Sequence, residues 1–192
     1  MAISMRVGVV PFGVAEGDLN RDGHSGDNSV SVFLGTGSGK LQSQITFSVG
    51  SIPYEIALGD FNKDGHIDIV TAKQDMQASS NDTVSVPLGP GSGGFQTQAV
   101  FGVRETPISV AVGVFDKDGN PYIVATNAVS NTVSVLLGNG AWDFQTQVTF
   151  DVGMSPVDVI ADNFNGDDYL DNLVGNVGEN TVGHLLGKPC DS

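Results

Sequence analysis

The sequence predicts an all-β fold, a β-propeller built from four repeats of about 49 residues. Three observations support this prediction. The same order of segments recurs along the chain, each full repeat has four short β-branched runs separated by Gly, Asn and Asp turns, and no long window has helical periodicity. Because a propeller blade has four strands and a period of roughly 40–50 residues, these observations favour a propeller.

A Val-Gly-x-x-Pro segment begins each repeat. It occurs at residues 7–11, 49–53 and 152–156, and residues 103–107 form a degenerate copy that lacks the glycine. An acidic loop follows each copy and begins at Asp18, Asp60, Val114 and Asn163. Successive loops start 42, 54 and 49 residues apart. The longest interval has about five additional residues near 77–81, and the shortest lacks about seven after His24, which correspond to the strand at 68–72.

Each repeat is expected to form one blade of a single domain that covers residues 1–192. The strands of the third repeat are expected near 109–114, 122–127, 132–137 and 145–152. The first run of a blade is small and apolar, which suits the innermost strand of a propeller. The expected boundaries are about 9–50 for blade 1, about 51–104 for blade 2, about 105–153 for blade 3 and about 154–187 for blade 4.

The N-terminal segment is expected to close the ring. The fourth repeat ends after its third strand, at residues 185–187, and residues 2–8 align with the fourth-strand segment 147–153. Strand 2–8 would then complete blade 4, and closure would satisfy strand edges that otherwise invite aggregation. Two arrangements remain as alternatives, an eight-bladed ring made from two chains and an open fragment of a longer propeller.

The charge of the chain is concentrated in the acidic loops. Net charge is −14 although charged residues make up only 16% of the sequence, and the acids are 18 Asp and 4 Glu. Clustered short carboxylates repel one another unless a cation lies among them. With eight Lys and Arg and no basic run, the chain is not expected to bind nucleic acid. No apolar run is long enough for membrane insertion, and the N-terminus lacks the pattern of a signal peptide.

The second acidic loop, residues 60–68, is the strongest candidate for a metal site. Asp60, Asn62 and Asp64 occupy positions one, three and five, and the carbonyl of His66 and the carboxylate of Asp68 occupy positions seven and nine. Ca2+ prefers six to eight oxygen ligands of these kinds. The first half resembles an EF-hand loop, but position twelve lacks the Glu of that motif and a strand follows instead of a helix.

The other loops preserve this pattern to different degrees. The candidate ligands of the first loop are Asp18, Asn20, Asp22 and His24, and those of the fourth loop are Asn163, Asn165, Asp167, Tyr169 and Asp171. In the fourth loop Asp168 replaces the turn glycine, which predicts a strained backbone. The third loop has lost positions one and nine. The alternative for all four loops is a set of ordinary Asp/Asn/Gly turns.

The pattern at residues 59–65, followed by Asp68-Ile69-Val70, resembles FG-GAP/VCBS-type repeats. These are the calcium-binding propeller repeats of integrin α-subunits and of many bacterial and invertebrate surface proteins. The run at 132–138 adds to the resemblance, which extends over residues 7–186. It implies a Ca2+-stabilised propeller, extracellular or at the cell surface, that is used in adhesion or ligand binding. The chain departs from the family in having four repeats instead of the usual seven.

The leading hypothesis is a non-enzymatic Ca2+-binding module that recognises an unknown protein or glycan. No Ser/His/Asp or Cys/His set indicates catalysis, and the Gly-rich segment at 35–40 lacks two residues of a phosphate-binding loop. One alternative is a self-assembling scaffold without a ligand, which would form a homo-oligomer. Another is a lectin, in which Trp142 would contact sugar.

Overall fold

The computed structural model shows an all-β protein. It describes residues 2–7, 10–15, 28–34, 40, 42–50, 52–74, 82–89, 95–115, 118–141 and 143–187. Every regular element in these ranges is a strand. A helix long and apolar enough to span a membrane is not found among them.

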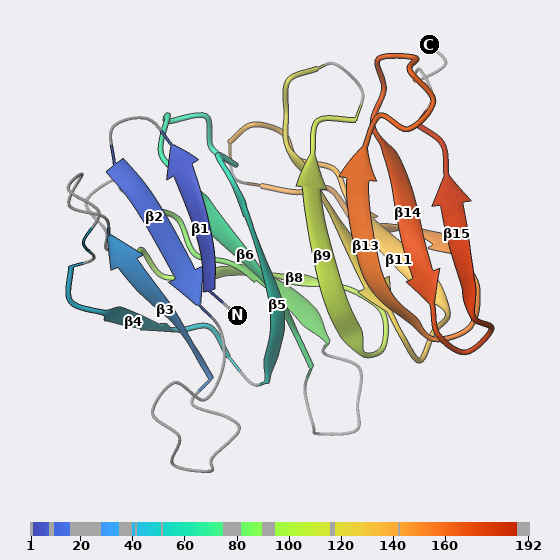
Figure 1. Ribbon diagram of the computed structural model, residues 1–192, viewed down its shortest axis with the longest axis horizontal. Helices are drawn as coiled ribbons and strands as arrows, with labels where there is room; N and C mark the ends of the chain where they lie inside the picture. The colour runs from blue at the N-terminus through green and yellow to red at the C-terminus, as the bar shows by residue number, and fades with distance from the viewer. Residues whose placement is uncertain are drawn as a thin grey trace.

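The strands form four antiparallel sheets in which neighbours follow sequence order (Figure 1). The first sheet contains β1 (Ala2–Val7), β2 (Val10–Ala15), β3 (Ser29–Leu34) and β4 (Ile45–Ser48). The second contains β5 (Pro53–Gly59), β6 (Asp68–Lys73), β7 (Thr83–Val86) and β8 (Ala99–Gly102). The third contains β9 (Pro107–Gly113), β10 (Tyr122–Asn127), β11 (Thr132–Leu136) and β12 (Val148–Asp151). The fourth contains only β13 (Pro156–Asp162), β14 (Asp171–Asn176) and β15 (Thr181–Leu185). The prediction of an all-β fold with four blade-like sheets is confirmed.

Consecutive sheets pack face to face, and the apolar core is divided among the three interfaces. Val30 and Val32 of the first sheet pack with Ile56 and Ile69 of the second. The other two cores lie between the second and third sheets and between the third and fourth. A sheet covered on both faces buries successive residues of one strand, and all six residues of β10 are accordingly buried.

The first strands β5, β9 and β13 lie side by side, and small residues allow them to approach closely (Figure 1). A Cβ atom at Gly113 would lie 2.5 Å from Leu170 Cδ1, and one at Gly59 would lie 3.0 Å from Val112 Cγ1. The small apolar composition of these strands therefore reflects crowding between neighbouring sheets, as the sequence predicted.

A repeated hydrogen bond also connects each sheet to the next. The side chains of Asn28, Asp82 and Asn131 accept hydrogen bonds from the backbone N–H groups of Ile52, Thr106 and Ser155, at 3.0, 2.6 and 2.9 Å. Each acceptor precedes the third strand of its own sheet, and each donor precedes the first strand of the next. The three donors have positive φ, so the link fixes a backbone conformation that these residue types rarely adopt.

The expected closure of the ring by the N-terminal strand is wrong. β1 pairs with β2 in the register Ala2↔Ala15 to Val7↔Val10, and it is therefore part of the first sheet. The first repeat lacks the counterpart of β6, so β2 has a free side, and only two residues separate β1 from β2. Pairing across so short a connection loses little loop entropy, whereas pairing with β15 would require closure of the whole chain. The four sheets are consequently not closed into a ring by this strand.

Candidate functional site

The second acidic loop joins β5 to β6 and is organised by its own short polar side chains. Asp60 accepts hydrogen bonds from the backbone N–H groups of Asp64 and Gly65, at 3.1 and 2.9 Å. Asn62 Oδ1 also accepts from the N–H of Asp64, at 3.1 Å, and Asn62 Nδ2 donates to Asp64 Oδ2 at 2.9 Å. The structure therefore brings together the side chains at positions one, three and five.

The backbone of this loop alternates in a way that few residues tolerate. Lys63 has φ of 58° and Gly65 has φ of 82°. Asp64 Oδ1 accepts from the N–H of His66 at 2.8 Å, which fixes the chain immediately after the turn glycine. Asn62 and Asp60 are half-buried, and Asp64 is exposed. The loop thus presents carboxylate and amide oxygens close to solvent, and this set of donor atoms fits a hard cation such as Ca2+.

Asp68, the expected ligand at position nine, occupies a different environment. It is fully buried, and its two carboxylate oxygens accept hydrogen bonds from Phe61 N at 2.9 Å and from Gly89 N at 2.7 Å. Burial raises the pKa of Asp68 to about 6; the two backbone N–H groups oppose this shift, and the charges of Asp64 and Asp60 add to it. Asp68 therefore braces the acidic loop against the turn that follows β7.

The fourth acidic loop has the same organisation although its sequence differs. Asn163 Oδ1 accepts from Gly166 N at 2.7 Å, and Asn165 Oδ1 accepts from Asp167 N at 2.9 Å. Asn165 Nδ2 donates to Asp167 Oδ2 at 2.9 Å, as Asn62 does to Asp64. Asp167 Oδ1 accepts from Tyr169 N at 2.9 Å.

The brace is repeated in the fourth sheet as well. The buried Asp171 accepts from Phe164 N at 3.0 Å and from Gly187 N at 2.8 Å. Asp168, which replaces the turn glycine, has φ of 68°, as the sequence predicted. Aspartate tolerates this conformation better than most residues, so the turn is retained at some cost in strain.

The third loop has replaced the brace with an aromatic contact. Tyr122 stands where Asp68 and Asp171 stand in the other repeats, and its ring stacks on Phe115 with centroids 6.0 Å apart. Asp118 accepts from the backbone and side chain of Asn120 at 2.6 and 2.5 Å. Val114 supplies no oxygen at position one, so this loop lacks the ligand set, as expected from its sequence.

The first loop, with Asp18, Asn20, Asp22 and His24, lies outside the described residues, as does Trp142. Within the described part of the chain, no three Asp, Glu, His or Cys side chains gather as a metal centre. At positions one, three and five, the second loop offers two carboxylates and one amide, and the fourth offers one carboxylate and two amides. The candidate ligands at these three positions therefore differ by one negative charge, and the fourth loop has a further carboxylate at Asp168.

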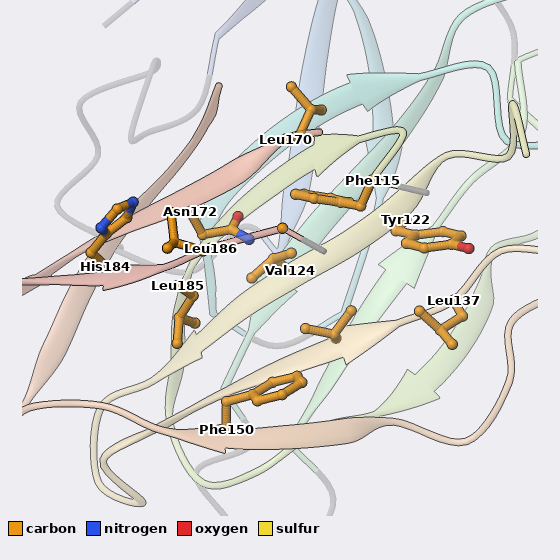
Figure 2. A pocket seen from close by; sticks show the side chains of 12 residues that line it. Phe115, Tyr122, Val124, Leu137, Phe150, Leu170, Asn172, His184, Leu185 and Leu186 are labelled. Carbon is orange, nitrogen blue, oxygen red and sulfur yellow. The ribbon is translucent and has the colours of Figure 1, made fainter. Parts of the chain in front are cut away.

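A second candidate site is an apolar pocket of about 540 Å3 between the third and fourth sheets. Figure 2 shows Phe115 above and Phe150 below, with His184 at one end and Tyr122 at the other. Asn172 also lines the pocket; it is only 8% exposed, and its Oδ1 atom has no hydrogen-bond partner. A pocket of this size and lining is in the range that binds small molecules or side chains.

Comparison with known proteins identifies the repeat. The model of the FG-GAP-like repeat family matches residues 18–71. The match supports an FG-GAP-type repeat in this part of the chain. The matched segment extends from the start of the first acidic loop into β6, so it contains the whole second loop. The resemblance stated from the sequence is confirmed for this segment, and the second and third sheets have the same strand order.

Two similar solved structures are of an exo-β-1,3-galactanase from Phanerochaete chrysosporium, in two variants of one glutamate, each with β-1,3-galactotriose. Their TM-scores are 0.61 and 0.58, both at 11% sequence identity. The likeness covers 91% of this chain and 43% of each galactanase chain. At this identity it shows the propeller-like fold alone. A search of curated protein sequences found no match.

The sequence did not reveal the brace partner of Asp68 or the pocket. A signal for the brace was present, because a Leu-Gly pair follows the third strand at 88–89, 137–138 and 186–187. Gly89 and Gly187 donate to the two brace carboxylates. The pocket arises from the packing of two sheets, which periodicity does not describe.

Proposed function

We propose that this chain is a Ca2+-binding, non-enzymatic propeller module that recognises a protein or glycan partner outside the cell. The observation that carries the proposal is the common frame of the second and fourth loops. Different sequences hold the side chains at positions three and five through the same hydrogen bonds, and in both loops the side chain at position one accepts from a backbone N–H of the loop. Ordinary turns do not require the same side-chain arrangement in two repeats that differ elsewhere.

Asp60, Asn62 and Asp64 would hold the ion in the second loop, together with the carbonyl of His66. Asn163, Asn165 and Asp167 would do so in the fourth, with the carbonyl of Tyr169. When bound, Ca2+ supplies positive charge that offsets the repulsion between neighbouring carboxylates. Asp68 and Asp171 hold each loop against its sheet, so that the oxygens keep their places. Each ion would thus stabilise the end of a sheet from which recognition loops project.

The physiological setting of the proposal is extracellular. Extracellular modules bind Ca2+ with dissociation constants of about 10⁻⁴–10⁻³ M, and each occupied site at millimolar Ca2+ then adds about 0.4–1.4 kcal/mol to the free energy of unfolding. The high ratio of Asp to Glu supports loop chemistry over general solubility, because Asp and Asn favour tight turns.

The test is calorimetric titration of Ca2+ into EDTA-treated, dialysed protein, with thermal melts on the same samples. We expect saturable binding and a higher melting temperature. In Asp60→Asn/Asp64→Asn, binding at the second loop should weaken at least tenfold, because two charges are removed while an acceptor oxygen remains at each position. Asp143→Ala/Asp151→Ala, which removes two exposed carboxylates elsewhere, is the matched control.

Absence of binding at several millimolar Ca2+ would contradict the proposal and leave the loops as hydrogen-bonded turns. Binding that the control variant weakens as much as the loop variant would show a general attraction of Ca2+ to the acidic surface. Either result would favour the scaffold alternative.

A further inference from the structure

Within the part of the chain that the structure describes, the fourth sheet ends at β15, whereas the other sheets have a fourth strand. In the second and third sheets, β7 pairs with β8 and β11 pairs with β12 over four residues each. The corresponding strand, β15, pairs with β14 on one side and forms the outer edge of its sheet. An edge of this kind carries backbone N–H and C=O groups that can accept an added strand.

The apolar pocket lies beside this edge, at a place that aromatic side chains fill in the other interfaces. Phe144 packs edge-to-face on Phe61 and Phe101, with ring centroids 5.7 and 4.9 Å apart, between the second and third sheets. Phe95 packs in the same way on Phe47, at 4.8 Å, between the first and second sheets.

Between the third and fourth sheets, Phe115 and Phe150 correspond to Phe61 and Phe101, and both line the pocket. The pocket therefore has the walls of an aromatic slot, and no described residue takes the place of the aromatic ring.

A backbone hydrogen bond beside each of these phenylalanines is also repeated in the second and third sheets. The residue after each phenylalanine donates its N–H to a carbonyl just past the third strand. Gln96 donates to Leu88 O and Gln145 donates to Leu137 O, both at 2.9 Å. The corresponding acceptor in the fourth sheet is the carbonyl of Leu186, a residue that lines the pocket. An incoming segment could thus repeat this contact before it pairs with β15.

Asn172 distinguishes this slot from the other two. The corresponding residues in the second and third sheets are Ile69 and Ile123, both fully buried in the apolar core. Asn172 is buried in the pocket wall with an unpartnered Oδ1 atom. A buried acceptor without a partner costs free energy, so the occupant is expected to bring a hydrogen-bond donor.

We propose that the β15 edge and the pocket form a docking site for an extended segment of another polypeptide. The segment adds a fourth strand to the sheet and inserts an aromatic side chain between Phe115 and Phe150. Tyrosine is preferred over phenylalanine, because its hydroxyl can donate to Asn172 Oδ1. Main-chain pairing supplies affinity, and the aromatic anchor sets the register, as in other strand-addition complexes. The proposal does not depend on Ca2+.

The probe is a labelled peptide with the sequence of residues 95–103, which is uncharged and contains the aromatic anchor and fourth-strand residues of the second repeat. Its binding to the full chain is measured by fluorescence anisotropy, with and without Ca2+. We expect saturable binding in both conditions. The peptide with Phe95→Ala should bind at least about tenfold more weakly, because the buried ring is lost. The peptide with Phe95→Tyr should bind more tightly than the original.

Three protein variants locate the site. Phe150→Asp should abolish binding by placing a charge in the pocket wall, whereas Val100→Asp, at a similarly exposed apolar position on β8, should not. Asn172→Ile, which restores the residue type of the other repeats, should remove the preference for tyrosine and retain binding of the phenylalanine peptide. Hydrogen exchange should show added protection of β15 amides when the peptide binds.

No binding up to millimolar peptide to folded protein would overturn the proposal. Binding that is insensitive to both Phe95→Ala and Phe150→Asp would do the same, because it would exclude the pocket. Binding without protection of β15 would exclude strand addition, and equal affinity for tyrosine and phenylalanine peptides would exclude the role of Asn172. A stable dimer that blocks the peptide would show that a second copy is the occupant and overturn the assignment to another polypeptide.

Discussion

Asp68 and Asp171 show how one buried carboxylate can connect two turns of a sheet. Each accepts one backbone N–H from the acidic loop and one from the glycine after the third strand. Both carboxylates are fully buried, and around Asp68 both hydrogen bonds are buried as well, so water cannot easily replace this acceptor. In the second and fourth repeats, the carboxylate at position nine therefore supports the fold whether or not a cation binds nearby.

Replacement of Asp68 by alanine should destabilise the protein by about 2–4 kcal/mol, because two buried N–H groups lose their acceptor. The measurement is urea unfolding in EDTA, which removes any contribution from Ca2+. Asp151→Ala, an exposed carboxylate on β12, serves as the control and should change the free energy of unfolding by less than about 0.5 kcal/mol. A loss below about 1 kcal/mol in Asp68→Ala would contradict the brace.

At the scale of the element, the turn after each third strand depends on a glycine that touches backbone. A Cβ atom at Gly89, Gly138 or Gly187 would lie 2.2–2.3 Å from the carbonyl oxygen of the residue that directly precedes the second strand of the same sheet. These carbonyls belong to Ile67, Pro121 and Leu170. Because the obstructing atom is part of the main chain, a side chain at these positions would force two loops apart.

Gly138→Ala should therefore destabilise the protein by about 1–3 kcal/mol through overpacking. Gly102→Ala is a matched control, since nothing lies within 4 Å of a Cβ atom there and its φ is not positive. The control should be neutral or slightly stabilising, because alanine restricts the unfolded chain. Thermal melts of the two variants test the prediction, and equal melting temperatures would contradict it.

The sequence predicted the positions of the strands better than it predicted which strands pair with one another. The repeat period located β9 to β12 within a few residues, because β-branched runs and Asp/Asn/Gly turns are local signals. It placed β1 with the wrong sheet, because an alternating strand can pair with any compatible edge and the nearer edge costs less entropy. It did not predict that Asp68, one of the candidate ligands, is buried and hydrogen-bonded to Phe61 N and Gly89 N, because position in a loop does not indicate whether a side chain points to solvent or into the sheet.

At the scale of the whole molecule, the outer face of the fourth sheet repeats a surface that is covered elsewhere. Val182 corresponds to Val133, and Ile160 corresponds to Ala111. Val133 is fully buried and Ala111 is 8% exposed beneath the fourth sheet, whereas Val182 is 69% and Ile160 52% exposed. Asn180 has the same positive φ as Asn28 and Asn131, whose side chains bind the following sheet. The last sheet thus keeps the surface that consecutive sheets use to pack together.

This face should make the protein self-associate as its concentration rises, since an apolar surface with a complementary sheet geometry favours burial. Sedimentation velocity between about 5 and 200 μM should show a growing dimer fraction. Ile160→Lys/Val182→Lys should shift the protein to monomer, because two charges would have to be buried between the sheets. Val100→Lys/Val148→Lys, which changes two exposed apolar residues on fourth strands, should leave association unchanged. A monomer over the whole range would show that the fourth sheet is stable uncovered, and loss of association in the control pair would transfer the contact to the strand edges of the second and third sheets.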